Sequence, residues 1–178
     1  ARPPPPRGGP TGARRTRGYA DRLLKDIQPS QFARLPRFET AGKPAVIQTN
    51  HPAWAYGHLA TYPSRVLETL GLKGSHVVAP AGFEDLFKDG TACLDDANGS
   101  IYPAMAAITA HYFKAYDAAI DAIAALDDAK LSAPTADEKA RVNFPIIGGR
   151  VNFMLNNHVM MHMGQVSAWR RCMGMAPA

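Results

Sequence analysis

Three of the six histidines are spaced so that their side chains could bind a metal ion. His158 and His162 are four residues apart, a spacing that places both imidazoles on one face of a helix, one turn apart. His58 lies in an otherwise apolar stretch, residues 53–60, which should face the interior of a helical protein. Helical bundles build metal sites from side chains on facing helices, and three neutral imidazoles leave a coordination position open for water or substrate. The alternative is that these histidines are ordinary hydrogen-bonded residues of the core or its edge.

The other histidines fit the pattern of a metal ligand less well. His51 lies two turns before His58, beside the expected start of a helix, where we expect it to cap the helix, form hydrogen bonds or line the mouth of the site. His111 lies at the edge of an apolar stripe, and His76 lies in a long loop where it should be exposed.

The pair on the last helix does not have the sequence of a metalloprotease. That signature is His-Glu-x-x-His, in which the glutamate is the general base. Val159 takes the glutamate's place here, so protease chemistry of this kind is disfavoured, while the metal site itself is unaffected. The neighbouring methionines are better explained as adaptable core packing than as copper ligands.

Apolar residues repeat at intervals of three and four in four parts of the chain, which predicts four long helices. No segment alternates with period two, so no strand is expected. Residues 72–100 form a long glycine-containing loop between the second and third helices, and residues 134–145 form a second linker. Four helices in a chain of this length predict an all-α fold, a four-helix bundle. The helices are expected at residues 19–27 with a start within 11–17, 50–71, 101–126 and 151–173.

The second helix carries clear signals at both ends. Asn50 is the predicted N-cap, and Pro52 suits the first turn because it has no amide hydrogen to satisfy. Gly71 is the predicted C-terminal stop. Pro63 lies inside the helix, where it removes a hydrogen bond and clashes with the preceding turn, so we expect a kink or break between about Leu59 and Ser64.

The positive charge of the chain is concentrated at one end. The 178 residues carry a net charge of +5, and residues 1–17 hold five arginines, five prolines and no acidic residue. The rest of the chain is therefore neutral, which argues against a nucleic-acid-binding surface. We predict a disordered basic arm over residues 1–17 and a single bundle domain over residues 18–178.

Several other classes of protein are excluded by composition. No apolar run approaches the roughly 18 to 20 residues that a membrane-spanning helix needs. Two cysteines, Cys93 and Cys172, cannot build a disulfide framework and lack zinc-ribbon spacing, so a reducing cytoplasm is the expected location. Because the sequence begins at Ala1 and not at a methionine, it is also compatible with a targeting segment that has been removed. We give little weight to catalysis by a cysteine nucleophile, because neither cysteine has a histidine nearby in the sequence.

Two segments together resemble the DinB/YfiT-like superfamily of metal-dependent proteins. They are residues 50–59 (NHPAWAYGHL) and residues 158–171 (HVMMHMGQVSAWRR), and the resemblance covers about residues 19–175. It implies a four-helix bundle in which His58, His158 and His162 hold a divalent metal ion, zinc or nickel. The family's glutamine after the last ligand matches Gln165, and its aromatic and arginine tail matches residues 169–171.

The sequence departs from the family pattern at two places. Many members carry an acidic residue where this chain has Val159, so a base or supporting role at that position is in doubt. Pro63 stands where the second helix usually continues.

The resemblance implies a cytoplasmic metal-dependent enzyme with a small-molecule substrate. Characterised relatives use low-molecular-weight thiols in transferase and isomerase reactions, and hydrolysis by an activated water is an equal alternative. Tyr56, Gln165 and Arg170 are candidates for lining the site and orienting the substrate, and no catalytic residue is assigned. The alternative from another class is a non-catalytic metal-binding or scaffold bundle, and a homodimer is compatible with either. No nucleic acid or membrane partner is expected.

Overall fold

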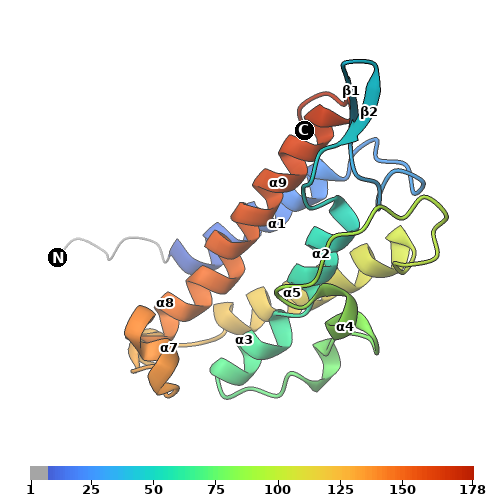
Figure 1. Cartoon of the computed structure of the whole chain (residues 1–178). Helices are drawn as coiled ribbons and strands as arrows, with labels where there is room; N and C mark the ends of the chain where they lie inside the picture. The colour runs from blue at the N-terminus through green and yellow to red at the C-terminus, as the bar shows by residue number, and fades with distance from the viewer. Residues whose placement is uncertain (1–7) are drawn as a thin grey trace.

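The computed structural model describes residues 8–178, and four helical rods dominate this part of the chain (Figure 1). Helix α1 contacts α5 and α9, and α2 contacts the same two helices, which closes a four-membered ring. This arrangement confirms the predicted all-α four-helix bundle. The rods are α1 (Gly8–Leu23), α2 (Pro52–Ala60) followed by α3 (Pro63–Thr69), α5 (Met105–Ala124), and α8 (Ile147–Asn152) followed by the π-helical segment η2 (Phe153–Asn157) and α9 (His158–Cys172).

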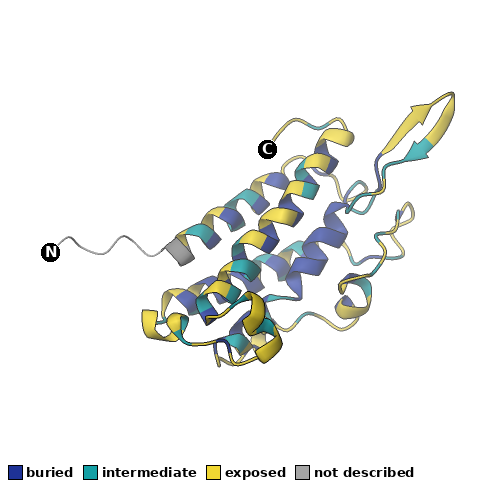
Figure 2. Ribbon diagram, turned by 60° about the vertical axis from the view of Figure 1, so that its left-hand side comes forward, coloured by how far each residue is buried: buried dark blue, intermediate teal, exposed yellow. Residues whose placement is uncertain are grey.

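The core lies between these helices, and the apolar periodicity of the sequence explains why. Every residue of α2 is buried, because α2 contacts α4 (Phe83–Phe87) as well as α5 and α9. Helix α5 buries one face and leaves Asp117 and Asp121 exposed on the other. Figure 2 shows that the helices of the bundle carry buried residues on their inner faces and exposed residues on their outer faces. The buried positions of α5 follow the predicted spacing of three and four: Ile108, Tyr112, Ala115, Tyr116, Ala119, Ile120 and Ile123.

Helix α1 starts well before the predicted domain boundary. Residues 8–17 are helical, so the prediction of a disordered arm is wrong for them, and residues 1–7 lie outside the described residues. The cause is that α1 buries Ala13 and Thr16 and pairs its charges with acids of α5. The ion pairs are Arg14 with Asp121 and Arg17 with Asp117, each at 3.0 Å.

The start of α2 is capped by His51 and not by Asn50. Nδ1 of His51 accepts a hydrogen bond from the amide of Trp54 at 3.2 Å, as an N-cap side chain does. The Asn50 amide group is turned instead toward Gln165. Pro52 occupies the first turn of α2, as predicted.

The predicted interruption at Pro63 is confirmed. Helix α2 ends at Ala60 and α3 begins at Pro63, whose missing amide hydrogen prevents the helical ladder from continuing. Helix α3 ends at Thr69, and Gly71 follows with a positive φ of 72°, which a glycine adopts without strain.

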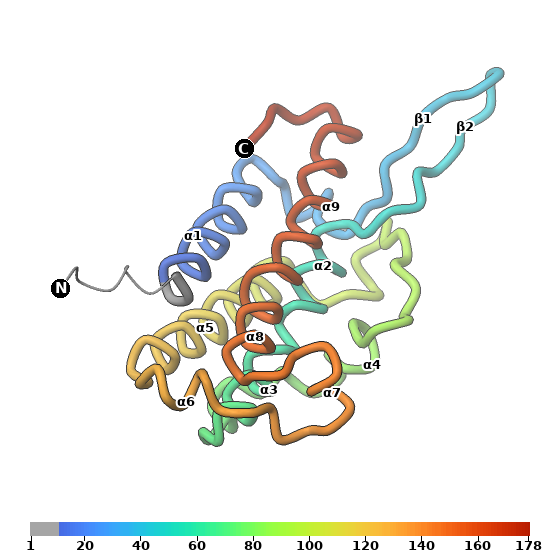
Figure 3. Tube along the Cα trace, turned by 90° about the vertical axis from the view of Figure 1, so that its left-hand side faces the viewer, coloured from blue at the N-terminus to red at the C-terminus, as the bar shows by residue number. Residues whose placement is uncertain are grey.

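The sequence predicts no strand, and this prediction is wrong because the structure contains a β-hairpin. Strand β1 (Arg37–Thr40) pairs antiparallel with β2 (Lys43–Val46), and the hairpin projects beyond the helices (Figure 3). Ala41 and Gly42 both have positive φ, as a tight two-residue hairpin turn requires. Strand β1 is exposed on both faces, so no apolar side chains alternate with polar ones and the sequence carries no period-two signal.

The long loop and the linker contain short helices. Besides α4, residues 72–100 include the 3-10 turn η1 (Ser75–Val77). The linker contains α7 (Glu138–Asn143), and α6 (Asp128–Ser132) lies just before it. The third long helix begins at Met105 and not at Ile101. The carboxylate of Asp96 explains the delay, because it accepts from the backbone amides of Ser100, Ile101 and Tyr102 and holds them in a turn.

Among the described residues, no helix combines the length and the apolar character that crossing a lipid bilayer requires.

Candidate metal centre

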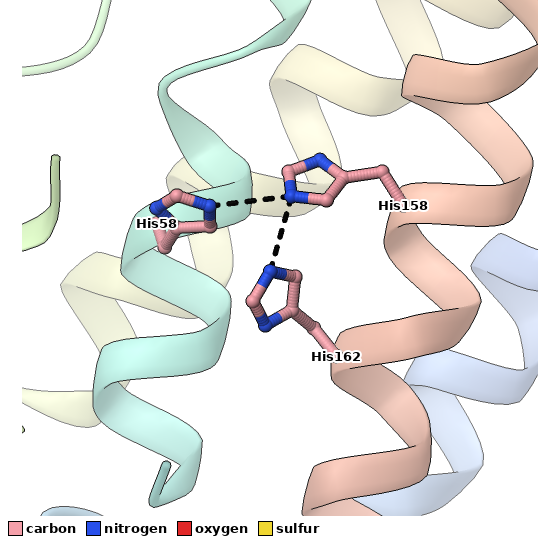
Figure 4. A group of neighbouring side chains, drawn as sticks. All are labelled: His58, His158 and His162. Atoms are coloured by element: carbon pink, nitrogen blue, oxygen red, sulfur yellow. Dashed lines mark hydrogen bonds between the residues drawn. The ribbon is translucent and has the colours of Figure 1, made fainter. Parts of the chain in front are cut away.

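The structure brings His58, His158 and His162 together between α2 and α9 (Figure 4). The Nε2 atoms of His58 and His158 lie 3.3 Å apart, and those of His158 and His162 lie 3.1 Å apart. All three side chains are buried, with exposed fractions of 3%, 9% and 8%. Three ring nitrogens from two facing helices therefore converge on one point, as the sequence predicts.

His58 is oriented by the loop that crosses α2. Its Nδ1 donates to the backbone carbonyl of Phe87 at 2.7 Å, so its Nε2 carries the lone pair that faces α9. The ring of Trp54, one helical turn earlier, stacks on the imidazole with ring centroids 4.7 Å apart. These contacts fix both the tautomer and the plane of the ring.

His162 is oriented by Gln165 on the same helix. Its Nδ1 lies 2.9 Å from the side-chain oxygen of Gln165, which can only accept, so Nδ1 carries the proton and Nε2 carries the lone pair. His162 thus has the same tautomer as His58. Such partners on the outer nitrogen are typical of metal-binding histidines.

His158 lies between the other two and is held by aromatic rings. Tyr62 makes an edge contact at 4.6 Å between centroids, and Phe153 stacks on the imidazole at 5.8 Å. The π-helical segment η2 ends directly before His158, a feature that often occurs at functional sites. Within the described part of the chain, Nδ1 of His158 is buried and has no hydrogen-bond partner.

The hydrogen bonds around the three rings fit a metal ion. The lone pairs of His58 and His162 both point at Nε2 of His158, and a proton on that atom could satisfy only one of them. If the proton of His158 is on Nδ1 instead, three lone pairs face each other in a buried space, which is unfavourable. A single cation among the three Nε2 atoms satisfies all of them, so the residues fit a divalent metal.

The electrostatic environment keeps these imidazoles neutral. Burial, followed by the charges of His162 and His58, lowers the pKa of His158 to about 4. Burial and His58 lower the pKa of His162 to about 4, against the hydrogen bond to Gln165. Burial also lowers the pKa of His58. Metal binding requires neutral imidazole, and the environment provides it.

His51 does not take part in the cluster. Its Nδ1 caps α2, and its Nε2 donates to the carbonyl of Leu94 at 2.9 Å, so both ring nitrogens are used. Burial lowers the pKa of His51 as well, against the hydrogen bond to Leu94. The expectation that this residue caps the helix and forms hydrogen bonds is confirmed.

Tyr56 and Arg170, two further predicted lining residues, also lie away from the cluster. Tyr56 is two positions from His58, on the opposite side of α2, and its hydroxyl donates to the carbonyl of Ala20 in α1. Arg170 lies two turns beyond His162, where its guanidinium donates to the carbonyls of Leu23 and Lys25 at the end of α1. Both residues join α1 to the bundle, whereas Gln165 contacts the cluster directly.

Several residues of the site were not singled out by the sequence. Trp54 and Tyr62 lie one turn before and one turn after His58, and that spacing is a signal that could have identified them. The carbonyl of Phe87 has no side-chain signal at all. Val159 is fully buried in the core, and its aliphatic side chain supplies no base.

The family of the chain can now be stated. Comparisons with curated proteins and with solved structures found no match. A sequence model of the DinB superfamily matches residues 13–166, a range that contains all three histidines and Gln165. The bundle, the histidine cluster and this match agree, and the chain belongs to the DinB superfamily.

Proposed function

We propose that this protein is a metal-dependent enzyme that activates a small thiol or a water molecule at His58, His158 and His162, with zinc or nickel as its metal. The observation that carries the proposal is the convergence of three Nε2 atoms whose lone pairs have no common hydrogen-bond donor. The proposal places the protein in the cytoplasm, where its two free cysteines would stay reduced.

The donor set favours an anionic partner for the metal. A bound divalent cation would supply Lewis acidity, lowering the pKa of a coordinated thiol or water. Three neutral imidazoles leave the positive charge of such a cation uncompensated, which favours an anion in the remaining position. The carbonyl of Phe87 and the side chain of Gln165 fix the orientation of two of the rings, and Trp54, Tyr62 and Phe153 pack apolar ring surface against the cluster.

The second candidate is a structural metal site in a non-catalytic scaffold. Two observations favour it: the three histidines are buried, and the cluster contains no carboxylate that could act as a base. In structural zinc sites the protein supplies all four ligands, and this cluster supplies three. That difference makes the enzyme the better proposal.

An activity screen separates the candidates. The metal-loaded protein is incubated with low-molecular-weight thiols and an electrophilic acceptor, and in parallel with hydrolysable esters and amides. The proposal predicts metal-dependent turnover in one of the two sets. It also predicts that His162→Ala abolishes this turnover and that His76→Ala, a change at an exposed position, preserves it. Stable metal binding with no turnover in either set would favour the scaffold.

A further inference from the structure

We infer that Asn50 is a positioning residue for the metal centre. Its side-chain amide orients Gln165 so that Gln165 presents its oxygen to His162, and this keeps the lone pair of His162 on Nε2, toward the other histidines. The inference rests on the proposed metal site. Asn50 therefore contributes to metal binding through two intervening side chains, without contacting the metal.

The geometry connects three residues in a row. Nδ2 of Asn50 donates to the side-chain oxygen of Gln165 at 3.0 Å, and the same oxygen lies 2.9 Å from Nδ1 of His162. His158, His162 and Gln165 follow each other at intervals of four and three, so they share one face of α9. Since His58 faces the first of these and Asn50 the last, the chain around α2 runs antiparallel to α9 along this face.

The orientation of the Gln165 amide decides which nitrogen of His162 is protonated. An amide has an accepting end and a donating end, and here the accepting oxygen receives two donors. If the amide were rotated by half a turn, its NH2 group would face the NH2 group of Asn50 and lose that hydrogen bond. It would also favour a proton on Nε2 of His162, which would remove the lone pair that binds metal. In its observed orientation the Asn50 amide disfavours this rotation, because its NH2 group donates to the oxygen of Gln165.

The position of Asn50 is itself fixed. The next residue, His51, is anchored in three ways: its backbone amide donates to Sγ of Cys93 at 3.4 Å, and its ring nitrogens bond to Trp54 and Leu94. The side chain of Asn50 therefore starts from a backbone that has little freedom. A single well-defined hydrogen bond to α9 is the expected consequence.

Substitutions can reverse or keep the orientation. In Asn50→Asp the new carboxylate can only accept, so it attracts the NH2 group of Gln165 and turns the amide around. In Gln165→Glu both ends of the side chain accept, so the proton stays on Nδ1 of His162. Asn98→Asp makes the same change of charge at an exposed loop position and is the matched control.

The test uses two readouts on the full chain. The first is the tautomer of His162 in the metal-free protein, read from two-bond hydrogen to nitrogen correlations by NMR with labelled histidine. The second is Zn²⁺ affinity, measured by competition with a chromophoric chelator. In Asn50→Asp we expect the proton to move to Nε2 and the affinity to fall about 10- to 100-fold, the usual range for residues that support metal ligands. In Asn98→Asp both readouts should match those of the unsubstituted protein, and in Gln165→Glu the proton of His162 should stay on Nδ1.

The outcomes separate the two proposals. If Asn50→Asp keeps the proton on Nδ1 and binds Zn²⁺ within about twofold of the unsubstituted protein, the role of Asn50 is refuted. If the unsubstituted protein binds no Zn²⁺, the proposed function fails, whereas the tautomer measured without metal still tests Asn50. Should Asn50→Asp fail to fold, Asn50→Ala removes the donor without adding charge. A mixture of both tautomers is then expected, and a pure Nδ1 tautomer would overturn the inference.

Discussion

The backbone carbonyl of Phe87 lies 2.7 Å from Nδ1 of His58, and the ring of Phe87 lies against Gly57, the residue before His58. A Cβ atom at position 57 would be only 2.5 Å from that ring. The glycine thus allows α4 to approach α2 closely enough for its carbonyl to orient the histidine. The core contact between Gly57 and the Phe87 ring and the hydrogen bond from His58 to the Phe87 carbonyl therefore both depend on how closely α2 and α4 pack.

Gly57→Ala should therefore damage both stability and metal binding. The added methyl group cannot fit beside the buried Phe87 ring, so α4 must move and the hydrogen bond to His58 lengthens. We expect a loss of about 1 to 3 kcal/mol in the free energy of unfolding, as is usual for overpacking, and weaker Zn²⁺ binding. Urea denaturation and chelator competition measure the two effects.

Gly164→Ala is the matched control for this substitution. Gly164 is a helical glycine in α9, close to His162, and a Cβ there meets nothing within 4 Å. Alanine should raise the stability by about 0.5 to 1 kcal/mol, because glycine is unfavourable inside a helix. Equal stability of the two variants would contradict the close approach of α4.

Acid sensitivity should depend on Asp95. Its carboxylate accepts hydrogen bonds from Arg34, Arg37 and the backbone amide of Leu35, and it is only 17% exposed. The hydrogen bonds from Arg34, and then from Arg37, lower its pKa well below the usual range for aspartate. Because the folded pKa lies below the unfolded value of about 3.9, this contribution to stability is complete above about pH 5 and decreases as the pH falls.

Asp95→Asn tests this relationship. At pH 7 the variant should be less stable by about 1 to 3 kcal/mol, the range for hydrogen bonds to charged groups, and the difference should shrink below about pH 4. Urea denaturation from pH 7 to pH 3 gives the curve. Asp85→Asn, at an exposed position of α4, is the control. A difference that stays constant across this range would show that Asp95 is not held ionised by its partners.

The first turns of α1 should be part of the folded body. Ala13 is buried and lines a small cavity of about 40 Å³ with Ile123 and Leu155. Ala13→Glu places a charge in this apolar contact and should cost several kcal/mol, while Ala110→Glu at an exposed position of α5 should change stability by less than about 0.5 kcal/mol. If circular dichroism melting curves show both variants to be equally stable, residues 8–17 do not pack on the bundle.

The sequence predicted the helices and the histidine cluster because both depend on periodicity. The interval of four between His158 and His162 places them on one helical face, and the apolar run around His58 buries it opposite them. The break at Pro63 was predictable because its cause is local: proline has no amide hydrogen and its ring clashes with the preceding turn. These features depend on residue type and spacing, which a sequence displays directly.

What the sequence did not reveal depends on contacts between distant segments. The carbonyl of Phe87 orients His58 without any contribution from its side chain, so residue type says nothing about it. Arg14 looked like part of a basic tail because its partner, Asp121, lies in a helix far along the chain. Arg170 and Tyr56 looked like site residues because they lie near the motifs in sequence, yet each faces α1.

The central claim is that His58, His158 and His162 hold one divalent metal ion. Untagged protein, purified without metal-affinity resin, is titrated with Zn²⁺ and Ni²⁺, dialysed and examined by elemental mass spectrometry. His58→Ala and His158→Ala are compared with His76→Ala, a histidine substitution at an exposed position. We expect about one metal ion per chain in the unsubstituted protein and in His76→Ala, and a loss in the other two variants. Less than about a tenth of a metal ion per chain, unchanged by His58→Ala, would contradict the account.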